Sequence, residues 1–269
     1  TQHDVLSVDT KTHQLTAQNM LTKEVFTDTY DKLIMTTGSY VVVPPLMGID
    51  DSRVLLCKSY EQAKNIYESA KNHKHIAIVG GGYVGVELAE AYADTDHEVT
   101  LVQSHDQVLN NYVDPLLSGK VTKLLKDHGV HVHLDEKVQA FHGTDKDDQI
   151  VLKTDKGELK ADLAIVSTGF MANTELLRGQ VDMDRHGAIL VDRYEQTSNP
   201  DVYAAGDACV SYFNPAGNNA YIPLATNAVR QGALAGINIF GKIQKNMGTQ
   251  ATSAMELFGY TLASSGLTT

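Results

Sequence analysis

The stretch that most constrains how this chain can fold is residues 75–103, HIAIVGGGYVGVELAEAYADTDHEVTLVQ. It opens with an apolar run at residues 76–79, which is too short for a helix and suits a buried parallel strand. Three glycines in the spacing G-x-G-x-x-G follow. A helix is then predicted to begin near Val84, and Glu98–Val102 is predicted to be the next strand. Strand, glycine turn, helix and strand in this order indicate a βαβ unit of an α/β protein.

The three glycines of the turn predict a specific chemistry. Gly80 permits a tight turn, Gly82 lets the backbone approach a pyrophosphate, and Gly85 lets helix and strand pack closely. The helix start adds unpaired N–H groups and the positive end of a dipole, both of which favour phosphate. We therefore predict a dinucleotide site. The alternative is a glycine-rich turn in an unrelated α/β protein, and the complete βαβ frame disfavours it.

The ribose position departs from the usual pattern. An acidic residue is expected there, about 20 residues beyond the turn, to bind the ribose hydroxyls of NAD. This chain has Gln103, followed by Ser104, His105 and Asp106. A glutamine can hydrogen-bond a ribose but does not repel a 2′-phosphate, and no arginine stands beside it to bind that phosphate. NADH is the favoured dinucleotide, and use of NADPH or of both stays open.

Composition excludes several classes of protein. The formal net charge of −11 argues against a nucleic-acid partner. No apolar run approaches the roughly 20 residues of a membrane-spanning helix. Cys57 and Cys209 lie far apart without a C-x-x-C pattern, which predicts a cytoplasmic protein without a disulfide framework. The chain starts at Thr1 and shows no signal-peptide pattern.

The rest of the chain adds elements on both sides of the glycine stretch. Residues 1–43 have the pattern of a β-meander followed by a strand, and residues 59–70 that of an amphipathic helix. A helix is predicted from Asp114-Pro115 to Gly129. A meander over 137–160 and a buried strand over 162–167 complete an α/β unit spanning 44–168. Residues 169–243 form another unit with a helix at 224–240, and residues 244–269 have a few apolar residues and no closing element of their own.

Two histidines in this region raise the question of a metal site. His131 and His133 alternate with apolar residues over 130–134. No further ligand lies nearby in the sequence, so a solvated strand face is the favoured interpretation and no metal site is predicted.

Two strand ends outside the central unit have residues suited to a ligand. A strand ends at Thr36, Thr37 and Gly38, where small residues let backbone come close to a bound molecule. A later strand ends at Gly206 and Asp207, and an Asp at the carboxyl end of a parallel strand can accept hydrogen bonds from ligand hydroxyls.

Together these motifs resemble the pyridine nucleotide–disulfide oxidoreductase family, in particular its NADH oxidase, NADH peroxidase and CoA-disulfide reductase branch. The matching stretches are YDKLIMTTGS, IAIVGGGYVGVELAEAYA, IVSTGFMANT, VYAAGDAC and LATNAVRQG, in the family's order and spacing. The resemblance implies a Rossmann-like NAD(P) domain, residues 44–168, inserted in a partial FAD domain of glutathione-reductase type, residues 1–43 and 169–243. Residues 244–269 would begin a truncated dimerisation domain.

The resemblance also implies roles for individual residues. The FAD-contacting positions would be Thr36, Thr37, Gly38, Gly206, Asp207, Leu224, Ala225 and Thr226. The dinucleotide-contacting positions would be Gly80, Gly81, Gly82, Tyr83, Val84, Gly85, Glu87, Gln103, Tyr112 and Gly169. Tyr83 would stand over the flavin where the nicotinamide enters. Met171-Ala172 departs from the family's Arg-Pro, so the match is weaker there.

The activity implied by the resemblance is hydride transfer from NAD(P)H to FAD and onward to a small oxidant: oxygen, peroxide or a disulfide. The family's FAD fingerprint, redox Cys and His base are expected upstream of Thr1, so no catalytic residue is assigned here and the chain alone is expected to be inactive. Cys57 and Cys209 are interpreted as buried packing residues. The full-length protein would be a homodimer. Open alternatives are a non-catalytic NAD(H)-sensing module and a CoA-disulfide or ferredoxin-type reductase.

Overall fold

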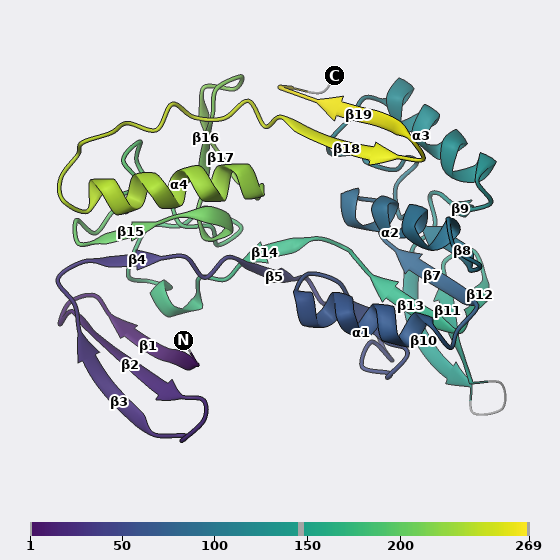
Figure 1. Cartoon of the computed structure of the whole chain (residues 1–269), viewed down its shortest axis with the longest axis horizontal. Coiled ribbons are helices and arrows are strands. Elements are labelled where there is room, and N and C mark those ends of the chain that lie inside the picture. Colours follow the sequence, from purple (N-terminus) through teal and green to yellow (C-terminus); the bar gives the residue numbers. More distant parts are fainter. Residues whose placement is uncertain (1, 145–147, 268–269) are drawn as a thin grey trace. The chain divides into compact units, whose positions relative to one another are not determined.

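A computed structural model describes residues 2–144 and 148–267 of the chain (Figure 1). By its internal contacts the chain forms two compact units. The central unit contains Val41–Phe170 and Ser253–Ser264. The split unit contains the residues up to Tyr40, then Met171–Thr252 and Ser265–Leu267. Short strands lie at the two points where the main chain passes between the units, β5 (Ser39–Val41) and β14 (Phe170–Ala172).

The central unit is built on a five-stranded parallel sheet in the order β6-β13-β7-β8-β9. Its strands are β6 (Val54–Leu56), β7 (His75–Val79), β8 (Glu98–Val102), β9 (His131–His133) and β13 (Leu163–Val166). The strand predicted at residues 98–102 is confirmed with the same bounds. The predicted α/β class with a Rossmann-like parallel sheet is therefore confirmed.

Both faces of this sheet are buried, and alternate side chains along each strand serve different layers. Ile76 and Ile78 belong to a hydrophobic cluster with the helices, whereas Ala77 and Val79 belong to one with a β-meander. The helices are α1 (Tyr60–Ala70), α2 (Tyr83–Ala93) and α3 (Pro115–Asp127). The meander is β10 (Val138–Thr144), β11 (Gln149–Thr154) and β12 (Glu158–Ala161). The continuous apolar runs of the sequence follow from this two-sided burial.

Local chemistry sets the ends of the helices. α1 begins with a capping box, in which Ser59 Oγ accepts from the Gln62 N–H at 3.2 Å and Gln62 Oε1 accepts from the Ser59 N–H at 3.1 Å. Pro115 opens α3, and Gly129 follows the helix with a φ of 85°. The predicted start and end of α3 are thus confirmed, because each rests on a residue with a restricted or unusual backbone.

The split unit begins with an antiparallel meander of β1 (His3–Asp9), β2 (Gln14–Asn19) and β3 (Val25–Thr29). Strands β4 (Leu33–Met35) and β15 (Val202–Ala204) pair in parallel, and α4 (Ala225–Asn238) packs against β15. β16 (Ser211–Phe213) and β17 (Asn218–Ala220) form a hairpin, and the single-turn helices are η1 (Glu175–Leu177) and η2 (Gly206–Ala208). None of the described helices is long and apolar enough to cross a membrane.

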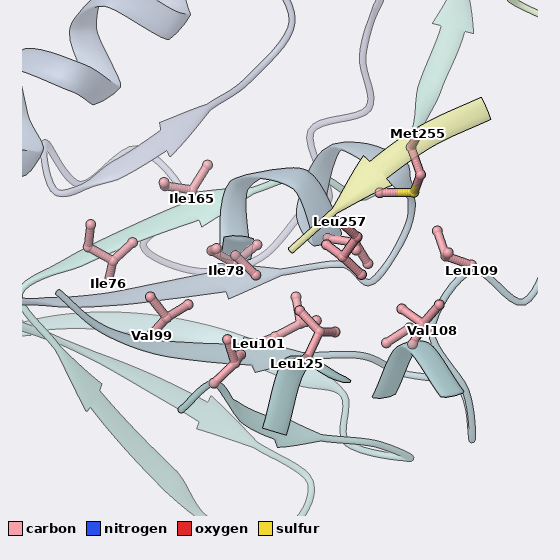
Figure 2. Close-up of a cluster of buried hydrophobic side chains, with 14 of the residues drawn as sticks. Ile76, Ile78, Val99, Leu101, Val108, Leu109, Leu125, Ile165, Met255 and Leu257 are labelled. Atoms are coloured by element: carbon pink, nitrogen blue, oxygen red, sulfur yellow. The ribbon is translucent and has the colours of Figure 1, made fainter. Parts of the chain in front are cut away.

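The prediction that residues 244–269 have no closing element of their own is wrong, because they form the hairpin β18 (Ser253–Leu257) and β19 (Tyr260–Ser264). Its turn residues Phe258 and Gly259 both have positive φ, 48° and 77°, as tight hairpins require. Met255, Leu257 and Leu262 join the helix-side cluster of the central unit, and Figure 2 shows Met255 and Leu257 among its side chains. The Phe258 ring stacks on His128 after α3, with centroids 3.8 Å apart.

We predict that Met255→Ala lowers the free energy of unfolding by about 2–4 kcal/mol, because it removes a buried side chain from this cluster. Tyr260→Ala, in the same hairpin but at a side chain 67% exposed, is the control and should cost less than about 1 kcal/mol. Urea unfolding followed by circular dichroism measures both. Equal losses would show that the hairpin is not anchored through its inner face.

Candidate functional site

The glycine turn after β7 lies where three parallel strands end. The Gly80 N–H donates to the carbonyl of Val102 at the end of β8, at 2.9 Å. Ser167, just after β13, donates from Oγ to the Gly80 carbonyl at 3.2 Å. Gly80 has a φ of 112°, and a side chain there would also lie 2.5 Å from the Ser167 carbonyl oxygen. The turn is therefore fixed from both neighbouring strands, at the sheet edge where α/β proteins bind ligands.

The two later glycines of the turn have opposite surroundings. A Cβ on Gly85 would lie 1.8 Å from the Gly80 carbonyl oxygen, so α2 can approach the turn only without a side chain there. A Cβ on Gly82 would have no atom within 4 Å. Gly82 is the N-cap residue of α2, and no side chain caps that helix end. Gly85 thus serves packing, while the space beside Gly82 and the first N–H groups of α2 can receive an anion.

Gln103 is placed next to the turn, but its amide is engaged by the protein. The side chain is 6% exposed. Its Oε1 accepts from the Gly81 N–H at 3.2 Å, and its Nε2 donates to the Gln107 carbonyl and to Asn110 Oδ1, each at 3.2 Å. Three of the four hydrogen-bonding positions of the amide are therefore used within the protein.

A loop after β8 completes this edge of the site. Leu109, fully buried with a φ of 53°, donates its N–H to the Gly81 carbonyl at 2.7 Å. Gly81 is thereby held from both sides, by the Gln103 side chain and by the Leu109 backbone. Ser104, His105 and Asp106 lie on the exposed part of the same loop.

The two tyrosines predicted for this site contact each other. The rings of Tyr83 and Tyr112 have centroids 4.4 Å apart at 47°. Tyr83 Oη also shares a hydrogen bond with Ser253 Oγ of the hairpin at 2.6 Å. Desolvation raises the pKa of the Tyr112 phenol, and the neighbouring Tyr83 adds to the shift.

Three predicted residues of the central unit remain, two in α2 and one after β13. Val84 is a partly buried residue in the first turn of α2, and Glu87 lies on its exposed side. Desolvation raises the pKa of Glu87, with a contribution from Glu90. Gly169 follows β13 with a φ of 116°, has open space where a side chain would stand, and accepts the Val42 N–H at 2.9 Å.

In the split unit the structure brings two predicted groups together. β4 and β15 are parallel neighbours, so the residues that follow them lie at one edge. Ser39, just beyond Gly38, donates from Oγ to Asp207 Oδ2 at 2.8 Å. The N–H of Asn173 donates to the Gly38 carbonyl at 2.9 Å, and Thr37 Oγ1 donates to the Asn173 carbonyl. Thr36 and Thr37 are exposed.

The start of α4 lies at this same edge. A Cβ on Gly206 would come 3.3 Å from the Cβ of Ala228 in the first turns of α4. The Gly206 N–H donates to Gln231 Oε1 at 3.2 Å. Leu224 is the N-cap residue and lacks a side-chain capping bond, and Ala225 and Thr226 are exposed. The three predicted flavin-contacting segments therefore converge in one unit.

Neither cysteine has the surroundings of a reactive thiolate. Both are free thiols. Cys209 is buried as predicted, whereas Cys57 is only half-buried. Desolvation raises the pKa of Cys57, and desolvation followed by the charge of Glu195 raises that of Cys209. Each packs in a hydrophobic cluster of its own unit, consistent with a packing role.

The expectation that no further ligand lies near His131 and His133 in the sequence is wrong for Glu136, since each histidine of β9 faces a carboxylate. His131 Nε2 lies 3.7 Å from Glu98 Oε1, and His133 Nδ1 lies 2.9 Å from Glu136 Oε2. A shallow hollow of about 370 Å³ borders this strand, lined by Lys126, Gly129 and residues 130–133. Within residues 2–144 and 148–267, no three His, Cys, Asp or Glu side chains gather as metal ligands would.

Sequence reasoning missed the residues that hold these turns. Ser39 donates a hydrogen bond to Asp207, and Ser167 donates one to the Gly80 carbonyl, each through its hydroxyl group. The G-x-G-x-x-G spacing offers no signal for either. The position of Ser39, directly after Thr36-Thr37-Gly38, is the only local hint.

The chain matches one protein family and several known proteins of that family. Residues 1–232 match the family model described as pyridine nucleotide-disulphide oxidoreductase. An NADH oxidase of Enterococcus faecalis is 45% identical over 267 residues, which are 99% of this chain and 60% of that protein. An NAD(P)H sulfur oxidoreductase (CoA-dependent) of Pyrococcus abyssi is 33% identical over 89% of this chain and 54% of its own length.

Among solved structures, the water-forming NADH oxidase of Lactobacillus brevis bound to NADH superimposes with a TM-score of 0.97 at 44% identity. The match covers 99% of this chain and 59% of that one. The chain thus spans about 60% of the length of these NADH oxidases. The resemblance seen in the motifs is confirmed: this chain belongs to the pyridine nucleotide-disulphide oxidoreductase family.

Proposed function

We propose that this chain supplies the NAD(P)H-binding part and half of the FAD-binding part of a flavin-dependent NAD(P)H oxidoreductase. In the intact protein, hydride would pass from nicotinamide to flavin and then to a small oxidant. The observation that carries this proposal is the contrast within the glycine turn. At Gly85 the Gly80 carbonyl leaves no room for a side chain, whereas Gly82 faces open space at the uncapped start of α2.

We assign the dinucleotide to the central unit. The first N–H groups of α2 would hold the pyrophosphate, and the loop after Gln103 would meet the adenine ribose. Tyr83 and Tyr112, already in ring contact, would border the ligand. Gly169, with open space at its Cα, would allow close approach of the nicotinamide end.

We assign half of the flavin site to the split unit. Gly38, with a φ of 70° and open space at its Cα, fits a close backbone approach. Asp207 is oriented by Ser39 and would accept hydrogen bonds from flavin hydroxyls. The uncapped start of α4 at Leu224, Ala225 and Thr226 would complete the half-site. A bound flavin would supply the two-electron chemistry, and these residues would orient it.

Oxygen is the proposed acceptor, because the more similar relatives are NADH oxidases. A disulfide is the second candidate, supported by the more distant sulfur oxidoreductase. A sensing module that binds only NAD(H) fits less well, because it would have no use for the convergence of Gly38, Asp207 and α4. We also propose that the intact protein is a cytoplasmic homodimer, in which residues 244–269 begin the dimerisation domain.

We predict that Gly82→Ala weakens NADH binding by at least about tenfold, because the new methyl group occupies the space proposed for the pyrophosphate. Unfolding stability should change by less than about 1 kcal/mol, since the backbone there has a φ of −78° and the Cβ meets nothing. Isothermal titration of the chain with NADH measures the affinity.

The matched variant is Gly85→Ala. It should lower stability by about 1–3 kcal/mol, because its Cβ must push α2 away from the Gly80 carbonyl. If Gly82→Ala bound NADH as well as the unsubstituted chain does, the pyrophosphate would not lie at this turn.

We further predict that Gln103→Asp lowers affinity for NADPH at least about tenfold more than affinity for NADH, because a carboxylate repels a 2′-phosphate. Gln103→Asn has the same length as the Asp variant without its charge. It should weaken both dinucleotides alike, through loss of the bonds to Gln107 and Asn110. Competitive titration with NADH and NADPH gives the ratio, and an unchanged ratio in the Asp variant would remove Gln103 from the ribose site.

A further inference from the structure

The carboxyl group of Glu195 is buried in the split unit, in the segment that leads to β15. Its side chain is fully buried, at 0% exposure. The residue also has a φ of 62°, a left-handed conformation that is uncommon for glutamate. The carbonyl of Glu195 accepts the Ala204 N–H at 3.0 Å, which holds this conformation against β15. A buried acid in an unusual backbone conformation needs a reason beyond packing.

Two side-chain amides donate to this carboxylate. Gln231 Nε2 in α4 donates to Glu195 Oε2 at 3.2 Å, and Asn246 Nδ2 donates to Glu195 Oε1 at 2.5 Å. The Gln231 Nε2 group also reaches the Val210 carbonyl at 3.0 Å and the Cys209 sulfur at 3.5 Å. Glu195 thereby joins α4 to the segment that follows it.

The orientation of both amides is fixed by backbone N–H groups. Gln231 Oε1 accepts from Gly206, at 3.2 Å, and Asn246 Oδ1 accepts from Gly248, at 2.8 Å. A backbone N–H can only donate, so each amide must turn its oxygen toward the glycine and its NH₂ group toward Glu195. The acceptor-only carboxylate fits two such donors, whereas a protonated carboxyl would place an O–H against one of them.

The surroundings of Glu195 act on its pKa in opposite directions. Burial is the largest influence and raises the pKa of Glu195 to about 7. The bonds from Asn246 and Gln231 act against this rise, as does Arg230, while Asp192 adds to it. Asp192 is itself paired with Lys242 at 2.7 Å. This rise brings the pKa of Glu195 toward neutral pH.

We propose that Glu195 is a proton-operated positioning residue, whose ionised form holds Gln231 and, through it, the turn at Gly206 and Asp207. Protonation would weaken the bond to Gln231 and loosen the Gly206 N–H contact beside Asp207. The importance of this turn for flavin binding rests on the function proposed above. The coupling of Glu195 to the turn can be measured in the ligand-free chain. Its test can therefore fail or succeed independently of that function.

The sign of the pH dependence distinguishes this linkage from a stabilising buried pair. Because the folded-state pKa is raised, the contribution of Glu195 to stability is full below pH 4.5 and is lost as pH rises through about 7. The hydrogen bonds that hold the turn are complete only above that range. The ionised form thus orders the turn at the expense of overall stability.

The test is a pH titration of the ¹⁵N-labelled chain, without ligand, followed by NMR at the amides of Gly206 and Gly248. We expect both resonances to move with one shared midpoint near pH 7. Glu195→Gln, which cannot ionise, should abolish that transition in both. Glu24→Gln, the same substitution at an exposed position of the same unit, should leave it unchanged.

The wild-type titration alone can overturn the proposal, whether or not the Gln variant folds. Flat resonances for Gly206 between pH 5.5 and 8.5 would do so, as would movement of Gly248 without Gly206. A transition at Gly206 that persists in Glu195→Gln would assign it to another group. A merely structural Glu195 would lower stability when replaced but would give no shared midpoint to lose.

Discussion

The contact on which the central unit depends is the approach of Gly85 to the carbonyl of Gly80, where a Cβ would lie 1.8 Å from the oxygen. This approach sets α2 against the end of β7 and directs its uncapped N–H groups to the edge where β13, β7 and β8 end. On the same turn, the space beside Gly82 is open. One turn thus combines close packing at Gly85 with open space at Gly82, three residues earlier, where we propose that the pyrophosphate binds.

The rigidity of that edge comes from burial on both faces of the sheet. The side chains of β7 alternate between the helix-side cluster and the meander-side cluster, so neither face can shift without opening a packed layer. The hairpin β18–β19 extends the helix-side cluster by adding Met255, Leu257 and Leu262, as Figure 2 illustrates for the first two. Its bond from Ser253 to Tyr83 reaches the first residue of α2. The helix that bears the site is therefore held by the sheet on one side and by the hairpin on another.

Sequence reasoning predicted the parts whose signals are local. Short apolar runs identified β7 and β8, because such runs are typical of buried strands. Pro115 and Gly129 identified the ends of α3, because each favours one backbone conformation. The hairpin was missed because its inward residues are few and their partners lie far away in the chain. The engagement of Gln103 was missed for a different reason. Its residue type allows a bond to a ribose or to the protein, and only the position of Gly81, Gln107 and Asn110 decides between them.

A common device supports the two candidate sites. In the central unit Gln103 Oε1 accepts from the Gly81 N–H, and in the split unit Gln231 Oε1 accepts from the Gly206 N–H, both at 3.2 Å. Each glutamine is nearly fully buried, and its NH₂ group donates hydrogen bonds to groups outside the turn. An amide suits this task because it accepts from a backbone N–H and donates elsewhere without burying a charge. The two sites differ in what the NH₂ group meets. The NH₂ group of Gln103 meets neutral oxygens, so its hydrogen bonds do not depend on the ionisation of a partner. The NH₂ group of Gln231 meets the ionisable Glu195, so on our proposal its turn responds to a proton.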